Sequence, residues 1–249
     1  MCPMTVSSLN GVERFCWLPM TPRFTSTGIG GSSASRPPCI GPWRSLIPGC
    51  RLMQQLEMAD GALGALPPWR PLLRAARQRE GRAPGAGWLQ LATVSAEGCP
   101  RVRTLVFRGW SAQGELELLT DTRSEKPNDL RHQPRVELCW LFRKTREQFR
   151  LRGLARVIDG EQDHEALEHH WQRLTPRGRA VWDWPQPGGP FKTEGPWPEQ
   201  IPDGVPQPDV FALIRVQLER VEQLDLKPHP HRRRCWLRDQ GWPEQHLNP

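Results

Sequence analysis

Tyrosine is missing altogether from the 249 residues, although the chain holds 12 tryptophans. No apolar run approaches the roughly 18 residues that a membrane-spanning helix needs, so we expect no membrane partner. The seven cysteines form no CxxC pair, which argues against a zinc site of the usual spacing and against a compact disulfide framework. Scattered cysteines in odd number are typical of a reducing compartment, and we predict a cytoplasmic protein.

Acidic residues are scarce in the first 50 residues, where Glu13 is the only one, and the segment 25–35 (TSTGIGGSSAS) has no structural period. Such a segment cannot bury enough apolar surface to offset its ordering entropy. We therefore interpret residues 1–65 as a disordered extension or as a mis-annotated start, with translation beginning at Met53 or Met58. The Ser-rich, acid-poor composition is also that of an organelle transit peptide, which would change the predicted location.

From Pro67 onward, short segments with strand or helix periods follow one another across turns. The pattern predicts helices near 68–81, from Ser124 and at 163–174, with a Pro/Gly-rich loop at 183–208. Strands are predicted at 88–94, 101–110, 115–120, 136–142, 149–151, 211–218 and 233–238. Short turns favour antiparallel hairpins. Residues 66–249 should therefore form an α+β or mainly β barrel of six or seven antiparallel strands with two or three peripheral helices.

Two clusters of basic and hydroxyl side chains lie beside apolar strands. The segment 101–108 (RVRTLVFR) carries cations at both ends, and a second cluster (Thr120, Arg123, Ser124, Lys126) spans a strand end and a helix start. Helix N-termini favour anions, and phosphates need cations with hydroxyl donors. The pattern indicates a phosphate-bearing aromatic ligand, with solvated cations at strand ends as the alternative interpretation.

Three segments in this order, RTLVFRGW, LLTDTRSEK and TREQFRLRG, resemble the pyridoxamine 5′-phosphate oxidase family, whose fold is a split β-barrel that binds flavin mononucleotide (FMN). The resemblance covers about 88–249 and is strongest at 101–153. The loop 184–188 (WPQPG) is similar to that of an oxidase-like subfamily with a Trp-Pro-x-Pro-Gly sequence. The resemblance implies FMN as cofactor, an unknown small-molecule substrate and a homodimer with two flavins at its interface.

The resemblance also implies the roles of individual residues. Basic and hydroxyl side chains would hold the phosphate and ribityl groups, namely Arg103, Arg108, Thr120 and Lys126. The strand 104–107 would lie along the flavin ring, and Gln148 would bind its pyrimidine edge. The full predicted cofactor-binding set is Arg103, Thr104, Leu105, Val106, Phe107, Arg108, Leu119, Thr120, Ser124, Lys126, Gln148, Gln186 and Arg233. No general base stands out, so the catalytic residue stays unknown, and we predict no metal ligand.

Departures from the family pattern concern mainly the substrate. The family's Ser-Arg-Lys turn reads Ser124-Glu125-Lys126, so an anion replaces one phosphate cation, for which Arg123 or Arg131 could substitute. In the oxidase a Tyr, an Arg and a Ser hold the substrate phosphate. The matching stretch here offers Trp171, Thr175, Arg177 and Gly178. We therefore expect FMN to be bound and pyridoxamine 5′-phosphate to be a poor substrate.

Three functions from different classes remain open. The first is an FMN-dependent oxidoreductase, and the second is a flavin-binding or storage protein without turnover. The third is a basic nucleic-acid-binding barrel of OB type, which the net charge of +7 and the basic run 229–234 would suit but which we disfavour. His164 and His169 are five apart, so we interpret their helix as solvated rather than metal-binding. Part of the tryptophan surplus (140, 182, 184, 236) would suit a dimer interface.

Overall fold

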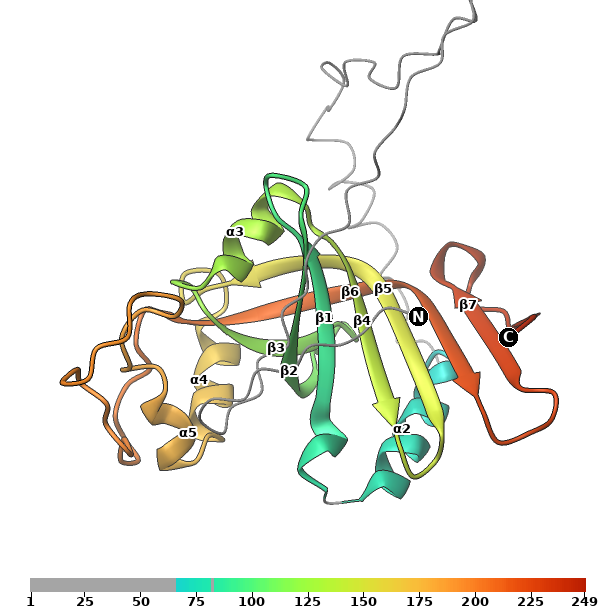
Figure 1. Ribbon diagram of the computed structural model, residues 1–249, viewed down its shortest axis with the longest axis horizontal. Coiled ribbons are helices and arrows are strands. Elements are labelled where there is room, and N and C mark those ends of the chain that lie inside the picture. The colour runs from blue at the N-terminus through green and yellow to red at the C-terminus, as the bar shows by residue number, and fades with distance from the viewer. Residues whose placement is uncertain (1–65, 82) are drawn as a thin grey trace, which may run out of the picture. The chain divides into compact units, whose positions relative to one another are not determined.

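The computed structural model describes residues 66–81 and 83–249 (Figure 1). The expectation for residues 1–65 lies outside these residues and stays a prediction. Within the described part, no helix is both long and apolar enough to cross a membrane.

Six antiparallel strands close into a barrel in the order β3-β2-β1-β4-β5-β6, because β3 pairs with both β2 and β6. Two further strands, β7 and β8, extend the sheet beyond β6. The strands are β1 (Trp88–Val94), β2 (Pro100–Trp110), β3 (Leu116–Asp121), β4 (Arg135–Phe142), β5 (Glu147–Ile158), β6 (Phe211–Asp225), β7 (Arg232–Leu237) and β8 (Gln245–Leu247). The predicted antiparallel split barrel is thereby confirmed.

Alternation along the strands fills the barrel with apolar side chains. In β1 and β4 every second residue is buried, and Leu91, Leu138 and Trp140 are completely enclosed. The rings of Phe107 and Trp140 lie 5.0 Å apart in this core. Burying one such side chain stabilises the fold by roughly 1.5–3 kcal/mol, so the interior is the main source of stability.

Two irregularities shape the barrel wall. In β2 the pairing with β3 shifts between Phe107 and Gly109, so Arg108 is the extra residue of a bulge. Gly109 adopts φ +157° there, a conformation that side chains with a Cβ rarely take. In β5 a Cβ at Gly153 would come within 2.0 Å of the Gln217 carbonyl oxygen, so the close approach of β5 and β6 requires glycine.

In the part of the chain that the structure describes, four α-helices surround the barrel: α2 (Trp69–Glu80), α3 (Glu125–His132), α4 (His164–Gln172) and α5 (Pro176–Ala180). Figure 1 shows α2 and α3 at opposite ends of the barrel and α4 with α5 beside β3. Gly81 ends α2 at φ +75°, as its position predicts, and the Asp163 side chain caps α4 by accepting from the Ala166 N–H. The sequence pattern gave no sign of α5 or β8.

A second apolar cluster lies outside the barrel, under α4 and α5. Leu167 and Trp171 of α4 pack with Phe211 of β6, and the Trp171 and Phe211 rings are 5.1 Å apart. This cluster fixes the position of α4 and of the long segment that follows α5.

Candidate functional site

The first of the predicted basic clusters is built where β2 passes under α3. Arg103 donates to Thr93 Oγ1 and to Asp129 Oδ2, the latter over 3.1 Å. Thr93 also donates to Asp129 Oδ2 over 2.7 Å. Thr93 and Asp129 are both buried, so their hydrogen bonds hold the guanidinium in one place.

Lys126 joins this cluster from the first turn of α3. Its ammonium donates to Ser124 Oγ over 2.9 Å, and Ser124 Oγ donates in turn to the Asp121 carbonyl over 2.7 Å. Burial lowers the pKa of Lys126, and the nearby positive charge of Arg103 lowers it further. Because Lys126 forms no ion pair with any described residue, a bound anion would relieve both effects. The cluster therefore has the charge and the donors that a phosphate requires.

Neither candidate for the missing cation is available at this point. Arg123 is held by Asp121 through bonds of 2.7–3.2 Å and also donates to the Trp182 carbonyl. Arg131 is exposed, and its only hydrogen bond within the described chain goes to Asn128. Glu125, which occupies the family's cation position, pairs with Arg101 over 2.8 Å. The cluster therefore works with two cations, Arg103 and Lys126.

The remaining predicted residues of β2 and β3 divide between the two sides of the barrel wall. Thr104, Val106 and Arg108 are exposed on the outer face, whereas Phe107 is buried on the inner face and Leu105 is half-buried. Thr120 is 2% exposed, and Leu119 belongs to the apolar cluster under α4.

That outer face is unusually apolar for an exposed surface. Trp88, Val102, Val106 and Leu141 are 50%, 67%, 38% and 49% exposed, and all four lie on the neighbouring strands β2, β1 and β4. Trp88 stands directly opposite Val106 in the register. Contiguous exposed apolar side chains of this kind mark binding surfaces for a ligand or a protein.

Gln148, Gln186 and Arg233 come from three separate regions. Gln148 lies at the start of β5 and donates to Cys139 Sγ over 3.1 Å. Arg233, on β7, donates twice to Glu222, at 3.1 and 2.7 Å, and Arg220 and Arg150 also donate to that carboxylate. Gln186 is exposed in the segment after α5, and Figure 1 shows that segment and β7 on opposite sides of the barrel.

The stretch that matches the family's substrate-phosphate residues is engaged in the fold instead. Trp171 is 2% exposed and donates its indole N–H to the Val205 carbonyl over 2.7 Å. Thr175 caps α5 by accepting from the Gly178 N–H. The neighbouring Arg179 is buried, donates to three carbonyl oxygens and pairs with Asp203 over 2.7 Å. Arg177, the cation at a matching position, is instead exposed and forms no hydrogen bond or ion pair with any described residue.

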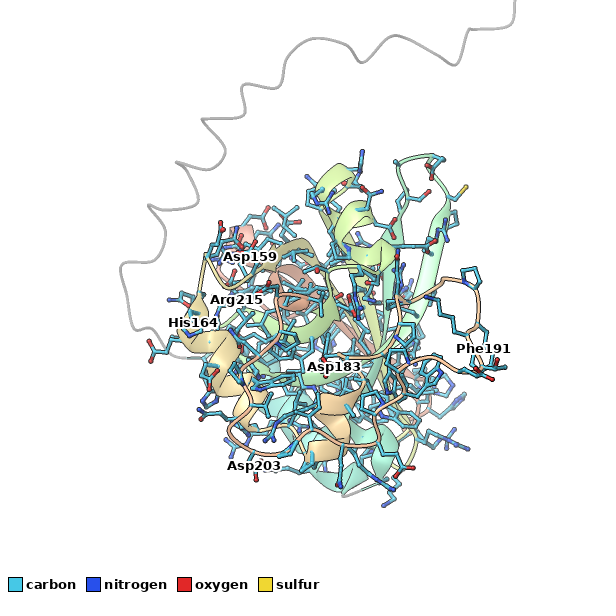
Figure 2. All side chains as sticks on the ribbon, turned by 90° about the vertical axis from the view of Figure 1, so that its left-hand side faces the viewer. Asp159, His164, Asp183, Phe191, Asp203 and Arg215 are labelled. Atoms are coloured by element: carbon cyan, nitrogen blue, oxygen red, sulfur yellow. The ribbon has the colours of Figure 1, made fainter. Side chains whose placement is uncertain are left out.

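A buried ionic network beside this stretch was not predicted from the sequence. Glu117 Oε1 accepts from Arg215 over 2.9 Å, and Glu117 Oε2 lies 2.9 Å from His170 Nε2. Arg215 also pairs with Asp163 over 2.7 Å, and Figure 2 shows its position beside α4. Burial by itself would raise the pKa of Glu117, but the bonds from His170 and Arg215 hold it below its ordinary value. His170 therefore serves this network rather than a solvated helix face.

Comparison with known proteins identifies a family of flavoproteins. Residues 66–159 match the family model described as pyridoxamine 5′-phosphate oxidase, FMN-binding domain. The chain is 34% identical over 168 residues to a pyridoxine/pyridoxamine 5′-phosphate oxidase 2 of Arabidopsis thaliana. The match covers 64% of this chain and 84% of that protein.

Solved structures have the same fold. A pyridoxamine 5′-phosphate oxidase-related, FMN-binding protein from Nostoc punctiforme is 35% identical, with a TM-score of 0.70 over 75% of this chain and all of the other. PhzG from Burkholderia lata, in complex with tetrahydrophenazine-1-carboxylic acid, is 18% identical with a TM-score of 0.55 over 76% of this chain and all of the other. At 18% identity, this match shows a shared fold and nothing more.

Proposed function

The chain belongs to the pyridoxamine 5′-phosphate oxidase family of FMN-binding split barrels, and from that membership we propose that it is an FMN-dependent oxidoreductase acting as a homodimer. FMN is the cofactor of the domain that residues 66–159 match. We propose further that its phosphate lies between Arg103, Ser124 and Lys126, and that the protein is cytoplasmic, for which the scattered cysteines remain the argument.

The observation that best supports the cofactor site is the environment of the Lys126 ammonium group. Its ammonium is half-buried beside a second cation and a hydroxyl, and it has no carboxylate partner among the described residues. Such an arrangement is unfavourable by itself and becomes favourable when a dianionic phosphate lies between the cations. The residues present therefore fit the phosphate of FMN.

We propose that the flavin ring lies along the outer face of β2. A ring that starts from this phosphate would run along the backbone of 104–107 and meet the exposed side chains of Val106 and Trp88. The bulge at Arg108 directs one more cation to the same face. Gln148 is then the amide offered to the pyrimidine edge, and its present acceptor, Cys139 Sγ, is weak enough to be exchanged.

Two features support the homodimer. The apolar outer face of β2, β1 and β4 would be covered by a second subunit, and closed two-fold symmetry is the commonest way to cover such a surface. Gln186 and Arg233 lie on opposite sides of one barrel, so a flavin near β2 would meet at least one of them from the partner. The expectation that surplus tryptophans lie at the dimer interface is wrong for Trp140, Trp182 and Trp236, because these three side chains are buried within the protomer.

The chemistry divides between cofactor and protein. Bound FMN would supply the hydride-transfer chemistry between a reduced substrate and an electron acceptor. This chain binds the phosphate with Arg103 and Lys126, aligns the ring on β2 and shields one ring face with apolar side chains. Because Trp171 and Thr175 are engaged in the fold and leave only Arg177 exposed at the matching positions, the substrate would be recognised mainly by other groups, such as Arg108.

Absorbance of the purified full chain tests the proposal. We expect yellow protein that releases FMN on denaturation and sediments as a dimer at micromolar concentration. Release of flavin adenine dinucleotide, or no flavin, would contradict the cofactor, and a flavin-loaded monomer would contradict the dimer. A panel of reduced substrates should bleach the flavin, with colour returning in air. Failure of every substrate would favour the alternative of a non-catalytic flavin carrier.

A further inference from the structure

A separate cavity of about 360 Å³ lies between α2 and the end of the barrel that α2 covers. Its walls include Arg70, Arg74 and Arg77 of α2 and the side chains of Phe107, Trp110 and Trp140. Phe107 enters from the inner face of β2, the opposite face from Thr104 and Val106, where we place the flavin ring. The cavity is therefore distinct from the proposed cofactor site.

The cationic wall is made by helical spacing. Arg70, Arg74 and Arg77 recur at i, i+4 and i+7, which places them on one face of α2. Among residues 66–81 and 83–249, no carboxylate lines the cavity, and none of the three arginines forms an ion pair. Like charges at this spacing repel one another, so the face is favourable only when an anion or solvent compensates it.

Burial makes this charge more costly. It lowers the pKa of Arg70 to about 10 and lowers that of Arg77 in the same direction. A group whose charged form is disfavoured by partial desolvation gains more from an anionic partner than a fully hydrated one does. The arrangement thus favours a negative charge beside α2.

Aromatic rings make the other walls. The Arg70 guanidinium lies 3.6 Å from the ring centroid of Trp110, and the Arg77 guanidinium 4.8 Å from that of Phe107. The Phe107 and Trp110 rings meet edge to face at 5.5 Å. Trp140 is completely buried, and its indole N–H has no hydrogen-bond partner within the described chain.

We propose that this cavity binds a small aromatic carboxylate, with its ring against Phe107 and Trp110 and its charge beside the three arginines of α2. A cation is excluded by the wall of guanidinium groups. An inorganic anion would use the arginines but leave the aromatic wall without contact. A neutral aromatic molecule would leave the cationic face uncompensated.

Calorimetric titration of the FMN-saturated full chain tests the site, because the cofactor then blocks its own binding surface. The probe is 2-naphthoate. Two control ligands each lack one of its features: 2-naphthamide lacks the negative charge, and inorganic phosphate lacks the aromatic ring. We expect saturable binding of one naphthoate per chain and at least about tenfold weaker binding of the other two. Equal affinity for the amide and the acid, or no saturable binding of the acid, would overturn the proposal.

Variants locate the binding on α2. The double variant Arg74→Ala, Arg77→Ala should weaken naphthoate by at least about tenfold, since both side chains are exposed and their loss spares the core. Arg79→Ala is the matched control, because Arg79 lies on the same helix but pairs with Glu147 away from the cavity. Loss of binding in the control alone, or none in the double variant, would contradict the site. Flavin absorbance, read separately, keeps this result independent of the cofactor proposal.

Discussion

At the α3 end of the barrel, Arg103 pairs with the carboxylate of Asp129, whereas Lys126 pairs with none of the described acids. Beside α4 the balance is reversed, because Arg215 lies between the two carboxylates Glu117 and Asp163. Both regions contain partly buried cations on β-strands. Only the first has positive charge in excess, and excess buried charge of one sign is what a ligand of the other sign can stabilise.

A similar contrast exists between the residues at the family's cofactor-phosphate positions and those at its substrate-phosphate positions. At the cofactor-phosphate positions, Arg103 and Lys126 are not fully buried, and Lys126 has no carboxylate partner among the described residues. Trp171 and Thr175, at the substrate positions, and their neighbour Arg179 form their hydrogen bonds inside the fold. A protein of this kind can retain FMN while its substrate differs from that of the oxidases. The predictions that follow would break or sharpen this comparison.

The largest expected effect concerns pyridoxamine 5′-phosphate, which should be a poor substrate or none. Each charge-assisted bond missing from a substrate phosphate forfeits roughly 1.5–3 kcal/mol, so three missing partners weaken binding by orders of magnitude. Steady-state oxidation should be measured at saturating FMN against a family oxidase. Turnover comparable with that enzyme would mean that other side chains, such as Arg173 or Arg177, hold the phosphate.

Lys126→Ala should lower FMN affinity by about ten- to a hundredfold, because the phosphate loses one charge-assisted bond. Arg131→Ala is the matched control, since Arg131 is an exposed cation of the same helix and should leave affinity unchanged. Fluorescence titration of apoprotein measures both. Sedimentation of wild type and variant across a dilution series then tests whether flavin stabilises the dimer by mass action. A flavin-free variant that dimerises as tightly as wild type would contradict that linkage.

Glu117→Gln should destabilise the fold by about 2 kcal/mol at neutral pH, because Arg215 and His170 lose a buried anionic partner. The pKa of Glu117 lies below its ordinary value of 4.5 in the folded protein. Its stabilisation is therefore present above that value and is lost as the pH falls through the lower folded pKa. Urea unfolding should show the difference between the two proteins shrinking as the pH falls below 4.5. A constant difference across this range would contradict the assignment.

Sequence reasoning found those parts of the fold whose signals are local. The alternation in β1 and β4, the start of α2 at Trp69 and the hydroxyl–cation cluster at Ser124 and Lys126 are all readable from neighbouring residues. The arginine spacing on α2 was equally readable, but no partner element could be assigned to that face from sequence.

The missed features depend on long-range pairing. Glu117 meets Arg215 only because β3 pairs with β6 across 98 positions of sequence. β6 continues to Asp225, beyond the predicted end at Leu218, because pairing with β5 and β7 stabilises a stretch whose own alternation is mostly polar. Helix α5 has only five residues after Thr175, too few to show a period. No local pattern could have shown that Gln186 and Arg233 lie on opposite sides.

Glu125→Gln should sharpen the excess of positive charge at the α3 end and raise FMN affinity by about two- to fivefold. Glu125 is exposed and paired with Arg101, so its negative charge acts on the phosphate only through solvent. The gain should shrink in about 0.5 M salt, where screening is stronger. Glu165→Gln on α4 is the control. A loss of affinity would mean that Glu125 positions Arg101 or Lys126 for the cofactor.

The smallest expected effect is that of removing residues 1–52. Both regions of the comparison lie within residues 66–249, and the removed segment contains the low-complexity stretch 25–35, which has almost no periodic apolar residues. A segment of that composition contributes little buried surface, so its loss should cost little stability. We expect the melting temperature to change by less than about 2 °C and the FMN content per chain to stay the same. Calorimetry and flavin absorbance on the shortened and full chains measure this. Insoluble protein, or a large drop in melting temperature, would mean that the extension packs on the barrel, and the balance of charge at Lys126 would then have to include its residues.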